Sequence, residues 1–334
     1  MKLAQLIASI SFGVALPLSL TAQERARLDT TVHLNLRGTV DLSLVSGKIT
    51  VRGWELPDVK VVASTENGVL RFDATSNRIT LRVERSREGA RSRGDASYDV
   101  SVPRGTRLLL QAATGNVTAN GSQGELSAST VSGVIDVSGA RRQVALESVS
   151  GPIRASDLSG DLRAQNVSGS VRAENISGRL EAWTVNGSIR VIGGRSNDIR
   201  AETVGGDILY AGPLMTGGTY DFESHSGTIR LTMPRNPSVQ VRLETVSGTV
   251  QTTVPIETAA SATKGRKGRH VEFTLGDGLA QVTARTFSGR IAIRSDAGPN
   301  GQRNSASIVR IDSVPRIRRD SAATTRKDSV STSR

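Results

Sequence analysis

The stretch SGDLRAQNVSGSVRAENISGRL at residues 159–180 repeats one phrase of nine residues. Each phrase begins with glycine and carries aliphatic residues or alanine two, four and seven positions later. Such phrases recur from Gly115 to Gly289, and as far as Gly187 the spacing between their glycines is always nine or its double. The later spacings are longer and less regular, and the last is close to two coils with a loop. Self-similarity at a fixed period predicts a solenoid.

The spacing within one phrase is that of a β-strand. Positions two and four after the glycine obey the two-residue period of a strand with one buried face, and Gly, Ser, Asn and Asp at the seams favour turns. Two phrases make one coil of about 18–21 residues, and successive coils are expected to stack parallel strands roughly 4.8 Å apart. An α-helix is excluded, because each glycine would cost it about 1 kcal/mol. We predict an all-β chain, a single-chain parallel β-solenoid preceded by a small β-rich N-terminal region.

Stacked coils place residues that are two phrases apart directly above one another. Arg154, Arg172 and Arg190 are then expected in one outward column next to Asp136, with Glu174 near enough to offset part of the charge. This basic stripe is a candidate binding surface for an anionic polymer. The alternative is a solvated outer face.

Other repeat positions have expected roles as well. Trp183 shares an outward column with Gln165, and we weigh stacking on a sugar ring against packing under a neighbouring loop. The aliphatic residues seven positions after each glycine are expected in the core with those at two and four. A single polar ladder is expected at the corners, formed by Asp157, Asn166, Asn175 and Thr184.

The 334 residues are expected to divide into four regions. Residues 1–22 have the order of a secretory signal peptide, which we expect to be cleaved rather than kept as a membrane anchor. Residues 23–110 hold alternating strands outside the nine-residue period and are expected to cap the solenoid. The repeat domain spans residues 111–295. Residues 296–334 are rich in Ser, Arg and Thr and are expected to be a disordered basic tail.

The net charge of +12 is concentrated in two segments, the tail and the run KGRKGR at 264–269. Exported proteins rarely act on nucleic acid, so we expect as partners anionic polysaccharide, lipid head groups or an envelope protein. After the signal peptide no apolar run is long enough to span a bilayer. The sequence leaves the oligomeric state open. Candidate polymer-binding residues are Arg154, Arg172, Arg190, Trp183, Lys264, Arg266, Lys267 and Arg269.

Patterns typical of catalytic and metal sites are missing. The G-G-x-G-x-D signature of calcium-binding solenoids does not occur, and His33, His225 and His270 lack partners at the spacing of a metal site or a triad. The outward positions carry mostly Arg, Ser and Asn, whereas a polysaccharide-cleaving β-helix needs clustered acids. We predict no cofactor, no metal and no enzymatic activity.

Four features together resemble a known family. They are GKITVRGWELPDVKVVA at 47–63, YDVSVPRGTRLLLQAATGNV at 98–117, the VSGxI series, and GDGLAQVTARTFSGRIAI at 276–293. The combination is similar to the bacterial putative-adhesin family of exported, glycine-rich β-solenoids, related to head GIN-type domains. The resemblance covers about residues 30–295 and implies the fold and a location in the periplasm or at the cell surface. It brings no catalytic residues.

Three functional hypotheses follow. The first is a non-enzymatic, adhesin-like protein of the cell envelope that presents a repetitive surface to envelope polymer or a partner. The second is a structural or self-assembling scaffold without a specific ligand. A carbohydrate-active enzyme is the weak third alternative.

Overall fold

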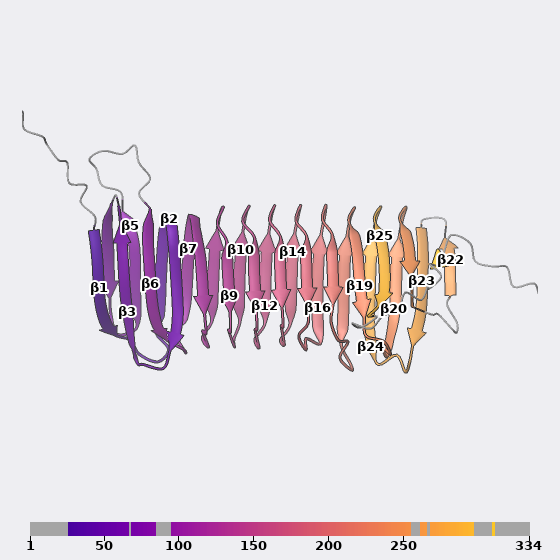
Figure 1. Cartoon of the computed structure of the whole chain (residues 1–334), viewed down its shortest axis with the longest axis horizontal. Coiled ribbons are helices and arrows are strands. Elements are labelled where there is room, and N and C mark those ends of the chain that lie inside the picture. Colours follow the sequence, from indigo (N-terminus) through magenta and orange to yellow (C-terminus); the bar gives the residue numbers. More distant parts are fainter. Residues whose placement is uncertain are drawn as a thin grey trace, which may run out of the picture.

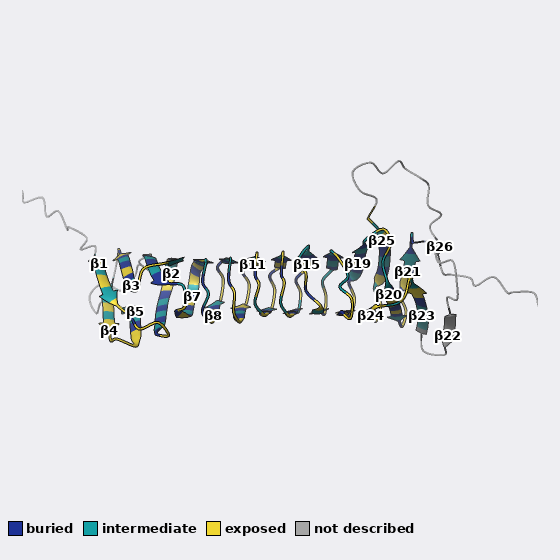
Figure 2. Cartoon of the chain, turned by 90° about the horizontal axis from the view of Figure 1, so that it is seen from below, coloured by how far each residue is buried: buried dark blue, intermediate teal, exposed yellow. Residues whose placement is uncertain are grey.

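The computed structural model describes residues 26–66, 68–84, 95–254, 261–265, 268–296 and 309–310. All elements in these residues are β-strands, which stand side by side along one long axis (Figure 1). Seen from below, the strands form two layers joined by tight corners (Figure 2). This is the predicted all-β solenoid. The expected signal peptide lies outside the described residues, as does the expected tail apart from Asp296, Val309 and Arg310.

Each coil of the repeat contributes one strand to each layer. We call the layer that contains Trp183 the tryptophan face and the layer that contains the arginine column the arginine face. The tryptophan face consists of β8 (Leu126–Thr130), β10 (Val144–Ser148), β12 (Leu162–Asn166), β14 (Leu180–Thr184), β16 (Asp198–Thr203), β18 (Thr219–Ser224), β24 (Ala280–Thr286) and β20 (Val239–Thr245). The arginine face consists of β9 (Ile135–Ser138), β11 (Ile153–Ser156), β13 (Val171–Glu174), β15 (Ile189–Ile192), β17 (Ile208–Ala211), β19 (Thr228–Met233), β25 (Arg290–Ser295) and β21 (Thr249–Thr252).

The register between coils follows the predicted period of two phrases. Arg154 lies opposite Arg172, and Arg172 lies opposite Arg190, on parallel strands of the arginine face. Gln165 lies opposite Trp183 on the tryptophan face. Alternate residues of each strand point inward, so the two layers enclose a thin core made mainly of Val, Ile, Leu and Ala. Burial of this apolar surface is the main force that holds the layers together.

The N-terminal strands belong to the same sheet. They are β1 (Ala26–His33), β2 (Thr39–Trp54), β3 (Asp58–Thr65), β4 (Val69–Ala74), β5 (Arg78–Glu84), β6 (Ala96–Pro103) and β7 (Arg107–Asn120). The long strand β2 pairs in parallel with β5 and β6 on one side and with β7 on the other. Strand β7 continues into the repeat by pairing with β8 and β9. Antiparallel pairs of β3 with β6, β4 with β5 and β1 with β3 end the parallel stack.

At the C-terminal end the coils do not stack in sequence order. Strand β24 lies between β18 and β20, and β25 lies between β19 and β21. A coil that comes later in the chain, formed by β24 and β25, therefore separates the coil of β20 and β21 from β18 and β19. The expectation that successive coils stack in sequence order is wrong at this end. Antiparallel strands then follow: β23 (Gly268–Leu275) on β20, β22 (Ser261–Gly265) on β23, and β26 (Val309–Arg310) on β21.

The corner that follows the tryptophan face is closed by buried polar side chains. The hydroxyl of Thr184 accepts a hydrogen bond from the Gly187 amide at 3.2 Å and donates one to the Gly169 oxygen, one coil earlier, at 3.4 Å. Buried main-chain groups need such partners, and here the side chains supply them. We call this set the buried polar ladder; its members are Thr130, Ser148, Asn166, Thr184, Thr203, Ser224, Thr286 and Thr245.

At the opposite corner, which follows the arginine face, the burial of the same repeat positions is reversed: the polar residue lies at the surface and the next residue is buried. Asp157 and Asn175 have φ of 55°, a left-handed conformation that Asp, Asn and Gly tolerate best. The turn directs the next side chains, Leu158 and Ile176, into the core. The single polar ladder expected from the sequence is therefore wrong, because Asp157 and Asn175 lie at this corner while Asn166 and Thr184 are buried at the other.

The expectation that every aliphatic residue seven positions after glycine is in the core is also wrong. Leu158 and Ile176 are buried, but Val167, at the equivalent position of the other corner, is 40% exposed. The physical reason is that the buried polar ladder occupies the interior there, which turns the next residue outward. A nine-residue period in the sequence thus conceals a burial period that is twice as long.

The repeat glycines allow a close approach of main chains. A Cβ on Gly169 would lie 2.2 Å from the Gly151 oxygen, and one on Gly151 would lie 1.7 Å from the Gly133 oxygen. Both distances are far inside van der Waals contact. Glycine is required at this corner because the preceding coil packs directly against its α-carbon.

Candidate functional site

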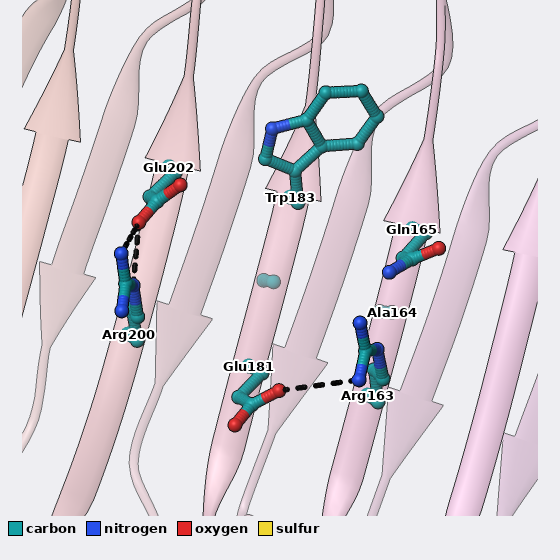
Figure 3. A pocket seen from close by; sticks show the side chains of 8 residues that line it. Arg163, Ala164, Gln165, Glu181, Trp183, Arg200 and Glu202 are labelled. Atoms are coloured by element: carbon teal, nitrogen blue, oxygen red, sulfur yellow. Dashed lines mark hydrogen bonds and ion pairs between the residues drawn. The ribbon is translucent and has the colours of Figure 1, made fainter.

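Trp183 stands on an open sheet. Its side chain projects from β14 and is 40% exposed. Gln165 and Glu202 are its neighbours in register on β12 and β16. Two positions earlier on the same strands stands a second row of outward residues, Arg163, Glu181 and Arg200 (Figure 3). The two rows form a flat grid of one indole, one amide, two carboxylates and two guanidinium groups.

Two shallow hollows meet at Trp183. The larger, of about 520 Å³, is lined by the residues of the grid together with the small side chains of Ala164 and Ala182. The smaller, of about 370 Å³, is bounded on one side by Val131, Val149 and Val167. Only Gln165 and Trp183 line both. The indole therefore separates a polar hollow from one with an apolar wall.

The charged groups of the larger hollow are paired with each other. Arg163 Nη1 lies 3.9 Å from Glu181 Oε2, and Gln165, with its amide oxygen turned toward Arg163, accepts hydrogen bonds from Nε and Nη2 at 3.0 Å. Arg200 donates to Glu202, and this hydrogen bond, with the Glu202 charge, raises the pKa of Arg200. Two guanidinium groups and two carboxylates leave the hollow without net charge.

The predicted arginine column is present on the arginine face. Arg172 is paired with Glu174 two positions along the same strand. Among the described residues, no carboxylate lies within 4.0 Å of Arg154 or Arg190. Leu209 follows Arg190 in the column, so the stripe is short. It presents two open guanidinium groups on either side of a paired one.

Of the four basic residues predicted around 264–269, Arg269 is the one whose side chain the structure describes. Arg269 lies in β23 opposite Thr245 and opposite Lys264 of β22. Arg266 and Lys267 lie outside the described residues, and so does the side chain of Lys264.

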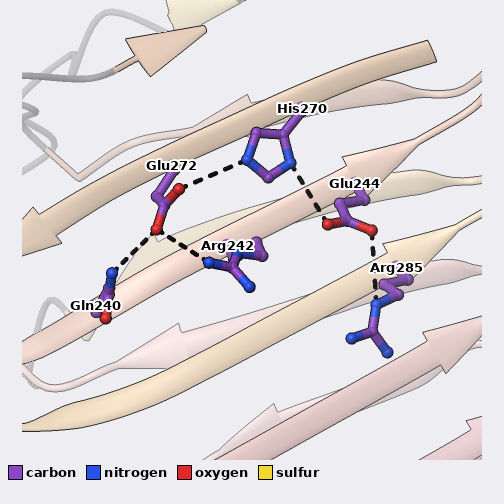
Figure 4. Close-up of polar contacts among 6 residues, drawn as sticks. All are labelled: Gln240, Arg242, Glu244, His270, Glu272 and Arg285. Atoms are coloured by element: carbon purple, nitrogen blue, oxygen red, sulfur yellow. Dashed lines mark hydrogen bonds and ion pairs between the residues drawn. The ribbon is translucent and has the colours of Figure 1, made fainter. Parts of the chain in front are cut away.

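A cluster of charged residues at that end was not predicted from the sequence. His270 lies between Glu244 on β20, at 3.4 Å, and Glu272 on β23, at 3.6 Å (Figure 4). Partial desolvation raises the pKa of Glu272, but the charge of Arg242 and hydrogen bonds from Arg242, His270 and Gln240 outweigh it and leave that pKa below its ordinary value. The cluster joins an antiparallel strand to the parallel stack. Its residues occupy every second position of β20 and of β23, as expected for one face of a strand. The nine-residue repeat, however, gives no indication that these two strands pair.

The remaining histidines have other contacts. His33 lies 3.0 Å from Asp58, and the ring of His225 stacks on Phe287. Across the described ranges, no three His, Asp or Glu side chains are close enough to hold a metal ion. Nor does that part of the chain contain a helix with the length and apolar character needed to cross a membrane.

The sequence placed Gln165 beside Trp183 and Arg163 beside Glu181, but it did not place Arg200 and Glu202. Arg163 and Glu181 keep the spacing of two phrases, but the step from Glu181 to Arg200 is longer by one position. An extra residue between Arg195 and Ile199, in the turn that leads into β16, shifts the count. Aligning phrases on their glycines would have placed Arg200 and Glu202 beside Glu181 and Trp183.

Comparison with known proteins gives a family match and several similar folds. Residues 100–294 match the model of a family described as Toastrack DUF4097. No curated protein matches the chain in sequence. Among solved structures, the chain is similar to "a putative cell adhesion protein" from Clostridium sporogenes, with 10% identity, a TM-score of 0.22, and coverage of 82% of this chain and 100% of that one.

Two further solved structures are similar over the same share of this chain. One is a "putative lipid binding protein" from Parabacteroides distasonis, with 10% identity, a TM-score of 0.42 and 98% of that chain covered. The other is "a putative adhesin" from Parabacteroides merdae, with 9% identity, a TM-score of 0.38, and coverage of 82% of this chain and 97% of that one.

Proposed function

The chain belongs to the Toastrack DUF4097 family, and from this premise we propose an exported, non-enzymatic, adhesin-like cell-envelope protein that binds envelope polymer on its flat faces. Export to the periplasm or the cell surface is supported by the order of charged, apolar and small residues in 1–22. The absence of cysteine means that such a protein needs no disulfides after export.

The observation that carries the polymer-binding proposal is Trp183 on an open sheet between two hollows. The face of an indole ring is electron-rich and attracts the weakly positive C–H groups of a sugar ring laid against it. The amide of Gln165 and the carboxylate of Glu202 stand on either side of the indole and offer hydrogen bonds to sugar hydroxyls. An extended glycan that lies along the long axis of the solenoid meets all three groups in turn.

The paired charges of the larger hollow favour a neutral glycan. An anionic sugar would have to compete with Glu181 and Glu202 for Arg163 and Arg200, and would meet two carboxylates as well. The same pairing argues for binding rather than catalysis. A glycosidase needs a carboxylic acid that is free to donate a proton to the leaving group, whereas Glu181 and Glu202 are both engaged with guanidinium groups.

A second candidate, favoured by a different observation, is an anionic polymer on the arginine face. Arg154 and Arg190 have no carboxylate partner in the described part of the chain. A guanidinium group can bind a carboxylate or phosphate group in a bidentate manner, through two parallel hydrogen bonds. Binding there would weaken with salt, since exposed charges are screened over about 10 Å at 0.1 M ionic strength.

The test uses the purified protein and two immobilised probe sets, neutral and anionic polysaccharides. Trp183→Ala is expected to weaken binding to a neutral polysaccharide at least about tenfold, the loss of one good aromatic contact, while Leu56→Ala, at an exposed apolar side chain outside the grid, leaves it unchanged. Arg154→Gln with Arg190→Gln is expected to affect only anionic probes at low salt. Binding that is equal in wild type and Trp183→Ala would refute the tryptophan site, and absence of binding to every probe would refute both sites.

Location is tested separately. Fractionation of cells, followed by protease treatment of intact cells, is expected to find the protein outside the cytoplasm. Recovery of the intact chain from the cytoplasmic fraction, with residues 1–22 still attached, contradicts export.

A further inference from the structure

A line of exposed apolar side chains runs along one edge of the solenoid. It occupies the corner that follows the tryptophan face, one residue beyond the buried polar ladder. Most of its valines are between 40% and 51% exposed, and Phe287 is 50% exposed. We call this line the valine stripe; in spatial order it consists of Val131, Val149, Val167, Val185, Val204, His225, Phe287 and Val246.

Main-chain hydrogen bonds hold the stripe together from coil to coil. The amide of Ser150 donates to the oxygen of Val131 at 2.8 Å, and the amide of Ser168 donates to the oxygen of Val149 at 2.8 Å. The same contact recurs along the edge as far as Ser247 and Phe287. Near the far end, the His225 and Phe287 rings stack with centroids 4.9 Å apart. The stripe is therefore straight and unbroken.

The coil's own packing does not require valine at these positions. The core positions of each coil are filled by other residues, and the corner is closed by the buried polar ladder and the glycine column. A threonine or serine would keep the same backbone and the same ladder. Long exposed apolar surfaces on a folded chain usually mark an interaction site, so the stripe indicates an external partner.

The surroundings of the stripe are nearly free of charge. The residues that follow the valines are Ser132, Ser150, Ser168, Asn186 and Gly205, all exposed. On the other side lies the smaller hollow, in which Glu147 is the one charged residue of the lining. A partner that packs here meets an apolar ridge with neutral polar margins, and charge does not select it.

We propose that the valine stripe is the docking surface for a second copy of this chain. The stripe places one side chain per strand, roughly every 4.8 Å. Only a surface with the same spacing can stay in register with it over its whole length. The same edge of a second copy has that repeat, that length and that lack of charge. A two-fold axis perpendicular to the edge brings the two ridges together in opposite directions, as in most homodimers.

The size of the surface fits this partner. The exposed area of the stripe is on the order of the 300–600 Å² reached by the largest apolar patches of monomers. Two stripes brought together bury about 600–1,200 Å² in total, which is the size of a weak interface whose dimer depends on protein concentration. No stripe residue lines the larger hollow at Trp183, so the dimer does not depend on the proposed polymer-binding function.

The first experiment is sedimentation equilibrium of the purified protein over a range of concentrations. Wild type is expected to approach twice the monomer mass, and Val149→Glu with Val167→Glu is expected to raise the dimer dissociation constant at least about a hundredfold. Val69→Glu, at a valine that is 57% exposed on β4, is the matched control and should dimerise as wild type does. Should the double glutamate variant not fold, Val149→Thr with Val167→Thr keeps the shape and is expected to raise the constant about tenfold.

The second experiment uses the absence of cysteine from the chain. Single substitutions Val131→Cys, Val149→Cys, Val167→Cys and Val204→Cys are oxidised and run under non-reducing conditions. The position nearest the two-fold axis is expected to form a disulfide-linked dimer, and Val69→Cys is expected to form no intermolecular disulfide. A wild-type protein that stays monomeric at all concentrations, or a dimer that the stripe variants do not weaken, overturns the proposal. Trp183→Ala should change polysaccharide binding without changing mass, which separates the two proposals.

Discussion

The side-chain amide of Asn166 donates a hydrogen bond of 2.7 Å to the main-chain oxygen of Gly151, one coil earlier in the solenoid. The amide oxygen of the same side chain accepts one of 2.7 Å from the Gly169 nitrogen. One buried side chain thus satisfies two main-chain groups in two coils. The same pattern recurs with threonine or serine in other coils of the buried polar ladder. The stability of the solenoid is therefore expected to depend strongly on its corners.

Replacing Thr184 by valine is expected to destabilise the protein by about 1–3 kcal/mol. Valine has the same shape, but it leaves the Gly187 nitrogen and the Gly169 oxygen without their buried partner. Urea unfolding measures the loss, and amide hydrogen exchange at Gly187 should become faster. Thr184→Ser keeps the hydroxyl and should retain most of the stability; an equal loss in both variants would show that the methyl group, not the hydrogen bonds, matters.

Gly169→Ala is expected to cost about 3–5 kcal/mol, at the upper end for a single substitution. The added Cβ would lie 2.2 Å from the Gly151 oxygen, so two coils must separate. Thermal unfolding should show a large decrease in Tm. Ser170→Ala, at the exposed residue next to it, is the control. A Gly169→Ala variant as stable as wild type would mean that the corner can move apart at little cost.

Two substitutions of Asn175, at the corner with left-handed backbone conformation, are expected to differ in stability. Asn175→Gly is expected to stay within about 1 kcal/mol of wild type, because glycine tolerates a φ of 55°. Asn175→Val is expected to lose about 1–3 kcal/mol from backbone strain. Both variants lose the hydrogen bond from Asn175 Nδ2 to Asp157 at 3.0 Å, so the difference between them reports the backbone strain. Chemical denaturation compares the two variants, and equal stability would contradict the backbone explanation.

The lowered pKa of Glu272 predicts a loss of stability in acid. The folded-state pKa lies below that of the unfolded chain, so the stabilisation is present above the unfolded pKa of about 4.3 and is lost as pH falls through the folded pKa. Urea unfolding of wild type and Glu272→Gln across pH 3–7 should show a gap at pH 7 that closes in acid. Glu147→Gln serves as the control, since Glu147 has no ion pair among the described residues. A gap that is the same at pH 3 and pH 7 would contradict this explanation.

Much of the fold could be predicted because stacking converts sequence spacing into spatial position. The period of two phrases was enough to place Arg154, Arg172 and Arg190 in one column, and the family match confirms the resemblance seen in the sequence. The pattern did not reveal which way each corner turns. That choice depends on local backbone conformation, such as the positive φ of Asp157, and it decides that Ile176 is buried while Val167 is exposed.

The candidate site could be predicted only in part. The sequence indicates which residues point outward, so Trp183 and Gln165 were found together. Pairing of the charges depends on side-chain reach along and across strands: Arg172 reaches Glu174 on its own strand, whereas Arg163 reaches Glu181 on the next. The cluster around His270 depends on an antiparallel pairing that no repeat encodes.

The position of β24 and β25 has a consequence for how the molecule is built. A chain synthesised from its N-terminus can add coils one at a time as far as β19, each on the coil before it. The next coil in space is then made by residues 280–295, which emerge after β20 and β21. Vectorial growth must therefore pause until nearly the whole described chain is available, and β20 and β21 join the solenoid together with the coil that separates them from β18 and β19.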